Sequence, residues 1–172
     1  MGSLETIAKI IDAINDWVGK ILSLLVLFIF VILLIEVVLR YFFNSPTIWA
    51  NELTQLIFGA YVILSGGYVL RWDGHVNVDI LYGKLSSRGK AIADIATSFL
   101  LFVFCGAMIY YGCSMAYDSL SRLEFSQSAW NPPLFPFKLM IPIGALLLLF
   151  QGIAKLIRDI LKLVNWECRN ES

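Results

Sequence analysis

The chain is poor in the residue types that carry out chemistry. Its 172 residues include one histidine, His75, which lies between two apolar segments rather than within one. A haem held in a bilayer would usually need histidine ligands inside the apolar segments, so no haem site is expected. The sequence also has no P-loop, no GxGxxG and no HExxH motif. Because catalysis requires several such groups placed together, we predict that the protein is not an enzyme and has no catalytic residues and no cofactor.

Cysteine content and net charge exclude two further classes. The three cysteines are Cys105 and Cys113 within an apolar segment and Cys168 near the C-terminus, so no disulfide framework is implied. Thirteen basic and thirteen acidic residues leave a formal net charge of zero. Without a basic face, nucleic acid is not an expected partner.

Long apolar segments dominate the chain. Hydrophobic residues make up 59% of it, and four segments carry few charges: 21–41, 47–70, 91–117 and 134–160. About 20 helical residues cross a bilayer core about 30 Å thick, and each segment reaches that length. The apolar runs are continuous rather than alternating, which favours helices over strands. The sequence therefore predicts an all-α integral membrane protein, with residues 1–172 forming one membrane domain of four transmembrane helices.

The distribution of lysine and arginine predicts the topology. Ten of these residues fall in the N-terminal segment, the connection after the second apolar segment and the C-terminal end, which share one side of the membrane if all four segments cross it. The remaining three fall at the connections after the first and third segments, on the opposite side. Cytoplasmic segments of membrane proteins are enriched in lysine and arginine, so we expect both termini in the cytoplasm. The first apolar run is too long for the core of a signal peptide, and no A-x-A-like site follows it. A cleaved signal is therefore not expected.

Residues 4–18 have the pattern of an amphipathic helix. Apolar side chains recur at helical spacing, and charged or polar ones such as Asp12, Asn15 and Asp16 take the other face. This helix is predicted to lie on the cytoplasmic membrane surface or against a partner helix. The alternative is a cytosolic extension of the first transmembrane helix.

Polar residues cluster at the outer ends of the first two apolar segments. Glu36 and Arg40 are four residues apart on one helical face, so they can form an ion pair. Ser45 is predicted to cap the second helix, with Pro46 at its first position. Trp49 suits the membrane interface, and Glu52 suits the positively polarised N-terminus of that helix. Small residues within the second and third segments predict close helix packing.

The connection after the second apolar segment holds the sequence Arg71-Trp-Asp-Gly-His75-Val-Asn-Val-Asp79. Its alternating polar residues allow a metal site, but a lone histidine with carboxylates is a weak signal. The favoured interpretation is a short interfacial helix over 78–85, capped by Asn77. In the last connection, prolines end one helix and begin the next. Trp130, Phe135 and Phe137 suit the outer membrane interface there.

Several of these motifs together resemble the small membrane subunit of TRAP (tripartite ATP-independent periplasmic) transporters, the DctQ type. They are Glu36-Val-Val-Leu-Arg40-Tyr, Trp49-Ala-Asn-Glu52-Leu, the Arg71–Asp79 stretch above, Trp130-Asn-Pro-Pro and Lys138-Leu-Met-Ile-Pro-Ile-Gly144. The resemblance implies a place in the bacterial inner membrane and a tripartite importer of small organic acid anions, driven by sodium rather than ATP. It implies three kinds of partner: a large membrane subunit (DctM type), a periplasmic binding protein (DctP type) and membrane lipids.

The resemblance also implies a role for this subunit, which is to pack on the large subunit and extend its static scaffold during elevator transport. Candidate subunit-interface residues are Glu36, Arg40, Trp49, Glu52, Arg71, His75 and Asp79. Candidate contacts to the periplasmic binding protein are Trp130, Pro132 and Phe135. The alternative function is a membrane anchor for a respiratory or other membrane enzyme complex.

Overall fold

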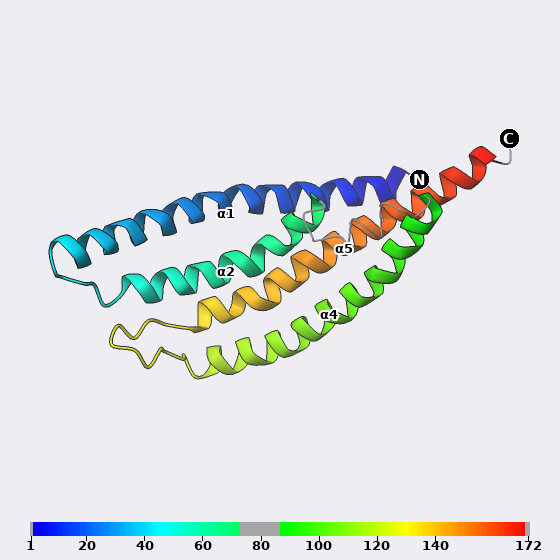
Figure 1. The fold of residues 1–172 in the computed structure, drawn as a ribbon. Helices are drawn as coiled ribbons and strands as arrows, with labels where there is room; N and C mark the ends of the chain where they lie inside the picture. Colours follow the sequence, from blue (N-terminus) through cyan, green and yellow to red (C-terminus); the bar gives the residue numbers. More distant parts are fainter. Residues whose placement is uncertain (1, 73–86, 171–172) are drawn as a thin grey trace.

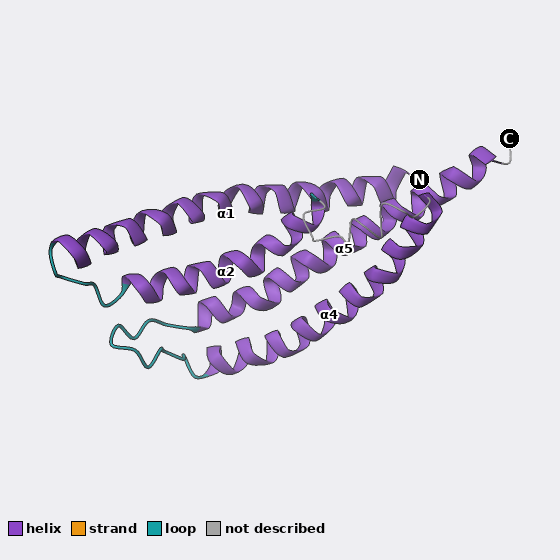
Figure 2. Cartoon of the chain, viewed as in Figure 1, coloured by secondary structure: helices purple, strands orange, loops and turns teal. Residues whose placement is uncertain are grey.

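The computed structural model describes residues 2–72 and 87–170, and within them it is helical apart from short connections (Figure 2). The helices are α1 (Gly2–Phe42), α2 (Ala50–Arg71), α4 (Ser87–Ser121) and α5 (Phe135–Asn170). Each contains a stretch long and apolar enough to cross a membrane: Thr6–Phe42, Ala50–Arg71, Thr97–Ser121 and Phe135–Ile160. The predicted all-α architecture with four transmembrane helices is confirmed for this part of the chain. The helix predicted over 78–85 lies outside the described residues.

The four helices run side by side in the order α1, α2, α5, α4 (Figure 1). α5 packs against α4 on one side and α2 on the other, and α1 packs against α2 and also reaches α5. The connections α1–α2 and α4–α5 lie at one end, called here the turn end (Figure 1). Both chain termini lie at the opposite end, called here the terminal end.

α1 is a single helix of 41 residues. Residues 4–18, predicted as a separate amphipathic helix, form its N-terminal part, which corresponds to the alternative of an extension of the first transmembrane helix. The sequence offers no proline or turn motif that would separate the two parts. At about 1.5 Å per residue, α1 is about 60 Å long, twice the thickness of a bilayer core.

α2 begins at Ala50, later than the predicted start at residue 47. The predicted cap Ser45 and the predicted first helical residue Pro46 both lie in the preceding loop. The reason is a tie between this loop and α1: the backbone N–H and the hydroxyl of Thr47 both donate to the Glu36 carboxylate, at 3.1 and 2.5 Å. The same hydroxyl accepts a hydrogen bond from the Ala50 N–H at 3.3 Å, so Thr47 takes over the capping role.

Two glycines allow α5 to lie close to its neighbours. A Cβ atom on Gly144 would be 2.5 Å from a side-chain carbon of Ile63 and 2.7 Å from its backbone oxygen. A Cβ on Gly67 would collide with Oδ1 of Asn15 and would be 3.1 Å from the Leu147 backbone oxygen. The predicted small-residue packing is thus present at Gly67. Gly59 and Gly106, by contrast, have nothing within 4 Å of a built Cβ.

Backbone hydrogen bonds order the connection between α4 and α5. The Leu123 N–H donates to the Leu120 oxygen and the Glu124 N–H to the Ser119 oxygen, which forms a Schellman motif at the end of α4. Leu123 accordingly takes the left-handed conformation, with φ of 45°. Further on, the Ser126 N–H donates to the Pro132 oxygen at 2.8 Å, and this closes the connection into a hairpin-like loop.

Candidate functional site

Glu36 organises the turn end of α1. Its side chain is buried, and its carboxylate accepts hydrogen bonds from Arg40 at 2.7 Å and from Thr47. A carboxylate facing the bilayer without such partners would cost several kcal/mol. The ion pair predicted from the spacing is present as a pair within one helix. The Arg40 side chain is 47% exposed, so part of its guanidinium still faces outward.

Glu52 joins α2 to the α4–α5 connection. Its two carboxylate oxygens accept hydrogen bonds from the hydroxyls of Ser126 and Ser128, each at 2.5 Å. Glu52 also lies in the first turn of α2, where the helix dipole favours a negative charge. The sequence grouped Glu52 with Glu36 and Arg40, but its partners are these two serines, which lie more than 70 residues away in the chain.

A second ion pair lies within the α4–α5 connection and the first turn of α5. Lys138 Nζ donates to Glu124 at 2.5 Å. This hydrogen bond holds the pKa of Glu124 below its ordinary value of 4.5. The turn end is therefore held together by three carboxylates that each have named partners.

The predicted aromatic and proline contacts also lie at the turn end. Trp49 occupies the cap position of α2 without a side-chain cap hydrogen bond, and it is exposed. Trp130 and Phe135 are half-buried, whereas Pro132 is buried. Of the three candidate contacts to a binding protein, Trp130 and Phe135 are therefore the ones with accessible surface.

A polar cluster joins three helices near the terminal end, and it is called here the buried polar cluster after its two buried members, Asn15 and Gln151. It consists of Asp12, Asn15 and Asp16 from α1, Arg71 from α2, and Gln151 and Arg158 from α5. Gln151 is fully buried and lies at its centre. It donates to Asp12 at 2.8 Å and accepts from Asn15 at 2.8 Å. Arg158 pairs with Asp12 at 3.2 Å.

Arg71 completes the buried polar cluster from α2. Its guanidinium forms an ion pair with Asp16 and donates to the backbone oxygen of Asp12. The sequence predicted that Arg71, with His75 and Asp79, orders the following connection against a partner. The structure shows Arg71 bound within its own chain, while His75 and Asp79 lie outside the described residues, together with the rest of the possible metal site at 73–79.

The members of the buried polar cluster are visible in the sequence as separate polar residues, but no sequence pattern predicts that they meet. Asp12, Asn15 and Asp16 lie on the predicted polar face of residues 4–18, and Gln151 is the one strongly polar residue between Lys138 and Lys155. One sequence signal for this contact exists: Asp12, Asn15, Asp16 and Gln151 all fall near the same predicted side of the membrane as Arg71 and Arg158. Lipid cannot satisfy polar groups, so they are expected to turn toward one another.

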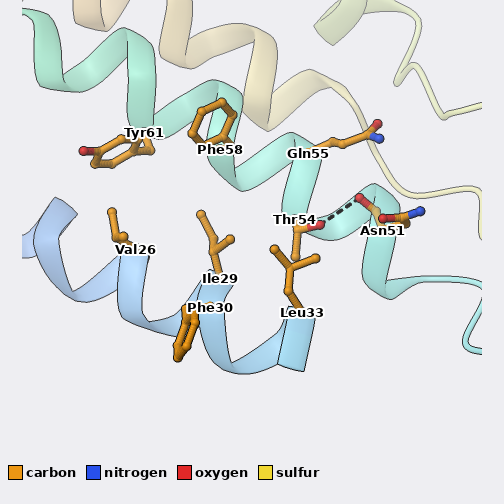
Figure 3. Close-up of a pocket in the computed structure, with 9 residues that line it drawn as sticks. All are labelled: Val26, Ile29, Phe30, Leu33, Asn51, Thr54, Gln55, Phe58 and Tyr61. Carbon is orange, nitrogen blue, oxygen red and sulfur yellow. Dashed lines mark hydrogen bonds between the residues drawn. The ribbon is translucent and has the colours of Figure 1, made fainter. Parts of the chain in front are cut away.

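An apolar groove of about 620 Å³ lies between α1 and α2 near the turn end (Figure 3). Val26 and Ile29 of α1 point toward Tyr61 and Phe58 of α2, and Leu33 points toward Thr54. The other lining residues are Phe30, Asn51, Thr54 and Gln55. None of the nine lining side chains is charged, so the groove lacks the cationic partner that a buried organic anion would need.

Among residues 2–72 and 87–170, no group of three or more His, Cys, Asp or Glu side chains is placed to hold a metal ion. The polar clusters described above tie helices of the same chain together. The four apolar helices and these internal contacts define a multi-pass membrane protein whose polar residues serve helix packing.

The family follows from comparison with known proteins. The model of the DctQ component of tripartite ATP-independent periplasmic transporters matches residues 29–162, which is most of the chain. The chain therefore belongs to the DctQ family of TRAP transporter small permease components. This confirms the resemblance found in the sequence, and it gives no support to the alternative of an enzyme-complex anchor.

Three similar proteins are named as TRAP transporter permease proteins. The sialic acid TRAP transporter permease protein SiaT of Haemophilus influenzae (strain 86-028NP) is 26% identical over 145 residues, which are 84% of this chain but 23% of SiaT. The small permease protein SiaQ of Vibrio cholerae is 24% identical over 157 residues, 89% of this chain and 85% of SiaQ. A putative TRAP transporter small permease protein of H. influenzae (strain Rd) is 30% identical over 90 residues, about half of each chain.

Proposed function

We propose that this chain is the small membrane subunit of a sodium-coupled TRAP transporter in the bacterial inner membrane. It packs on the large membrane subunit and extends the static scaffold against which the moving part of that subunit slides. The imported substrate is a small organic acid anion. The relatives SiaT and SiaQ support this class, because their names specify sialic acid, which is itself a carboxylate.

The observation that carries this proposal is the open arrangement of the helices. In the most apolar stretches of α1, α2 and α4, only 17% of residues are buried inside the chain, and in α5 the share is 33%. A compact bundle would enclose a core, whereas this row of helices leaves most of its apolar surface outside. Such a surface suits a wall that is covered by lipid and by another membrane subunit.

The polar residues support the same role. Glu36, Glu52 and the buried polar cluster all have partners within the chain, so they hold the row of helices in a fixed arrangement. A static scaffold needs this internal fixation, and a substrate site would instead need polar groups directed at a cavity. We therefore assign the substrate and sodium sites to the large subunit, and substrate capture to the periplasmic binding protein.

The proposed orientation places the terminal end in the cytoplasm and the turn end in the periplasm, following the distribution of basic residues. In this orientation the exposed parts of Arg40 and Trp49 are available to the large subunit near the periplasmic face. Trp130 and Phe135 are available to the periplasmic binding protein. Pro132, which is buried, would shape that loop rather than touch the partner.

Co-purification from native membranes in mild detergent tests the proposal. A tagged chain is expected to bring down a large polytopic protein, identified by mass spectrometry, and proteoliposomes containing both are expected to take up an organic acid only with a sodium gradient and the binding protein present. Recovery of a soluble redox enzyme, or of no membrane partner, would contradict the proposal. The matched control omits this chain from the proteoliposomes, which should abolish uptake.

An Arg40→Glu variant tests the candidate interface at the turn end. It should lower recovery of the large subunit if Arg40 contacts it. Because Arg40 also neutralises the buried Glu36, thermal unfolding of the variant chain alone must be measured in parallel. Lower recovery with unchanged unfolding would assign the effect to the interface.

A further inference from the structure

The N-terminal part of α1 carries an exposed apolar stripe. It consists of Ile7, Ile10, Ile14, Trp17 and Ile21, and these side chains are between 41% and 66% exposed. Their spacing alternates between three and four residues, which places them along one side of the helix. This is the spacing of a helix that packs lengthwise against another helix. We refer to these five residues as the apolar stripe.

The buried polar cluster fixes the direction in which the stripe faces. Asn15, which is 1% exposed, lies on the opposite side of α1 and is held by Gln151, while Asp12 is held by Gln151 and Arg158. Rotating α1 to bury the stripe in the chain would expose these polar groups and break their hydrogen bonds. The stripe therefore faces away from α2 and α5.

Lipid alone does not account for the stripe. Lys20 and Arg40 are exposed and lie 20 residues apart, about 30 Å along the helix, which matches a bilayer core. Transmembrane helices tilt by at most about 40°, and at that angle about 26 residues fit in the core. If Arg40 marks one edge of the hydrocarbon core, this stretch of about 26 residues extends toward the N-terminus as far as Asn15. Ile7, Ile10 and Ile14 then remain beyond the hydrocarbon on the terminal side.

The helix also cannot bend to lay the stripe on the membrane surface. α1 is continuous from Gly2 to Phe42, and Asp12, Asn15 and Asp16 are tied to α2 or α5. A surface-bound segment would need a break near residue 19 and the loss of these ties. A protein partner is therefore the occupant that fits.

The relative SiaT points to the kind of partner. The matched region is 84% of this chain but 23% of SiaT, so a much larger polypeptide is covalently joined to it there. Both termini of the present chain lie at the terminal end, where the stripe is (Figure 1). Whichever terminus is joined in SiaT, the additional sequence leaves from the end that carries the stripe. A different polypeptide, rather than a second copy of this chain, is thus placed close to it.

We propose that the apolar stripe of α1 docks lengthwise against an apolar-faced helix of the large membrane subunit, at the edge of the bilayer on the terminal side. This assignment rests on the proposed function, which supplies the large subunit. It adds a specific contact surface, of which Ile7, Ile10 and Ile14 lie beyond the hydrocarbon core. This surface is at the opposite end from the predicted interface residues Glu36, Arg40, Trp49 and Glu52.

Site-specific photo-crosslinking in native membranes tests the docking. A photo-reactive phenylalanine is introduced at Ile10 or Ile14, and at Lys9 as the control, because Lys9 is exposed in the same segment but on another side of the helix. Crosslinks to the large subunit are expected from positions 10 and 14 and not from position 9. Crosslinks mainly to a second copy of this chain, or equal yields at all three positions, would overturn the inference.

A pair of charge variants gives an independent readout. Ile14→Lys places a charge in the stripe, whereas Lys9→Glu changes a charge at an exposed position on another side of the helix. Ile14→Lys should lower recovery of the large subunit about tenfold or more, because it removes the burial of one large aliphatic side chain, and Lys9→Glu should lower it much less.

The wild-type control separates the two proposals. Suppose that the large subunit co-purifies with the wild-type chain while positions 10 and 14 give no crosslinks to it and Ile14→Lys leaves its recovery unchanged. In that case the docking inference fails and the proposed function stands. If no large subunit co-purifies with the wild-type chain, the proposed function fails, and the inference fails with it.

Discussion

Replacing Gly144 with alanine should disturb the contact between α5 and α2. Among the glycines of these two helices, Gly144 is the one whose added methyl group would approach the other helix most closely without meeting a polar side chain. The added Cβ would lie 2.5 Å from a side-chain carbon of Ile63, 2.7 Å from its backbone oxygen and 2.9 Å from its carbonyl carbon. Ordinary contacts between such atoms are about 3.5–4.0 Å. Two of the three atoms belong to the backbone of α2, so a side-chain rotation cannot relieve the clash and the helices must move apart.

The size of the stability loss caused by Gly144→Ala follows from comparison with Gly59→Ala. A Cβ on Gly59 meets nothing within 4 Å. Both substitutions gain about 1 kcal/mol of helix preference, because alanine favours the helix over glycine. This gain cancels in the comparison, which leaves the overpacking term at position 144. Gly144→Ala should therefore be less stable than Gly59→Ala by about 1–3 kcal/mol.

Thermal unfolding of the detergent-solubilised chain measures this difference. Reaction of the buried Cys105 thiol with a fluorescent maleimide reports unfolding, in a background in which the exposed Cys113 and the C-terminal Cys168 are replaced by serine. We expect a lower midpoint for Gly144→Ala and an unchanged or higher midpoint for Gly59→Ala. Equal midpoints for the two variants would refute the close approach of α5 to α2 at this position.

Three further changes test the polar contacts. Gln151→Leu should lower the free energy of unfolding by about 1–3 kcal/mol, because buried partners lose their hydrogen bonds, whereas Gln55→Leu, at an exposed position, should change it by less than about 0.5 kcal/mol in the same assay. Glu52→Ala should free the α4–α5 connection, which would appear as faster amide hydrogen exchange there with the helices unchanged. The pKa of Glu124 is lowered in the folded state, so its contribution to stability is present above pH 4.5 and is lost as the pH falls through the lower folded-state value. Lys138→Met should remove this acid-dependent loss in unfolding measured against pH.

The transmembrane architecture was predictable because its signal is local. Continuous apolar runs of about 20 residues leave few alternatives to membrane-spanning helices, and the structure places a helix at each of the four runs. Helix ends were less predictable. α2 begins at Ala50 because Glu36 holds Thr47 in the preceding loop, and this contact joins residues 11 positions apart in the chain.

The candidate site was predictable only where its contacts are short-range. The Glu36–Arg40 pair follows from the i,i+4 spacing. The partners of Glu52 and Gln151 lie more than 70 and more than 130 residues away, and no periodic pattern in one segment reveals them. For residues 4–18, periodicity revealed two faces but not which face turns inward. In water the apolar face would be buried, but here Asp12 and Asn15 turn inward and the isoleucines outward.

This reversal of the faces bears on how the subunit recognises its partner. The described helices direct most of their strongly polar side chains toward one another, so the surface in the middle of the bilayer is nearly uniform and apolar. Such a surface is chemically similar to lipid and gives little specificity of its own. Specific recognition of the partner subunit must then come from close shape fit and from side chains at the turn end and the terminal end. At the turn end, Arg40, Trp49 and the carboxamides of Asn51 and Gln55 are accessible. At the terminal end, the apolar stripe extends beyond the bilayer core, where an exposed isoleucine gains more from a protein partner than from water.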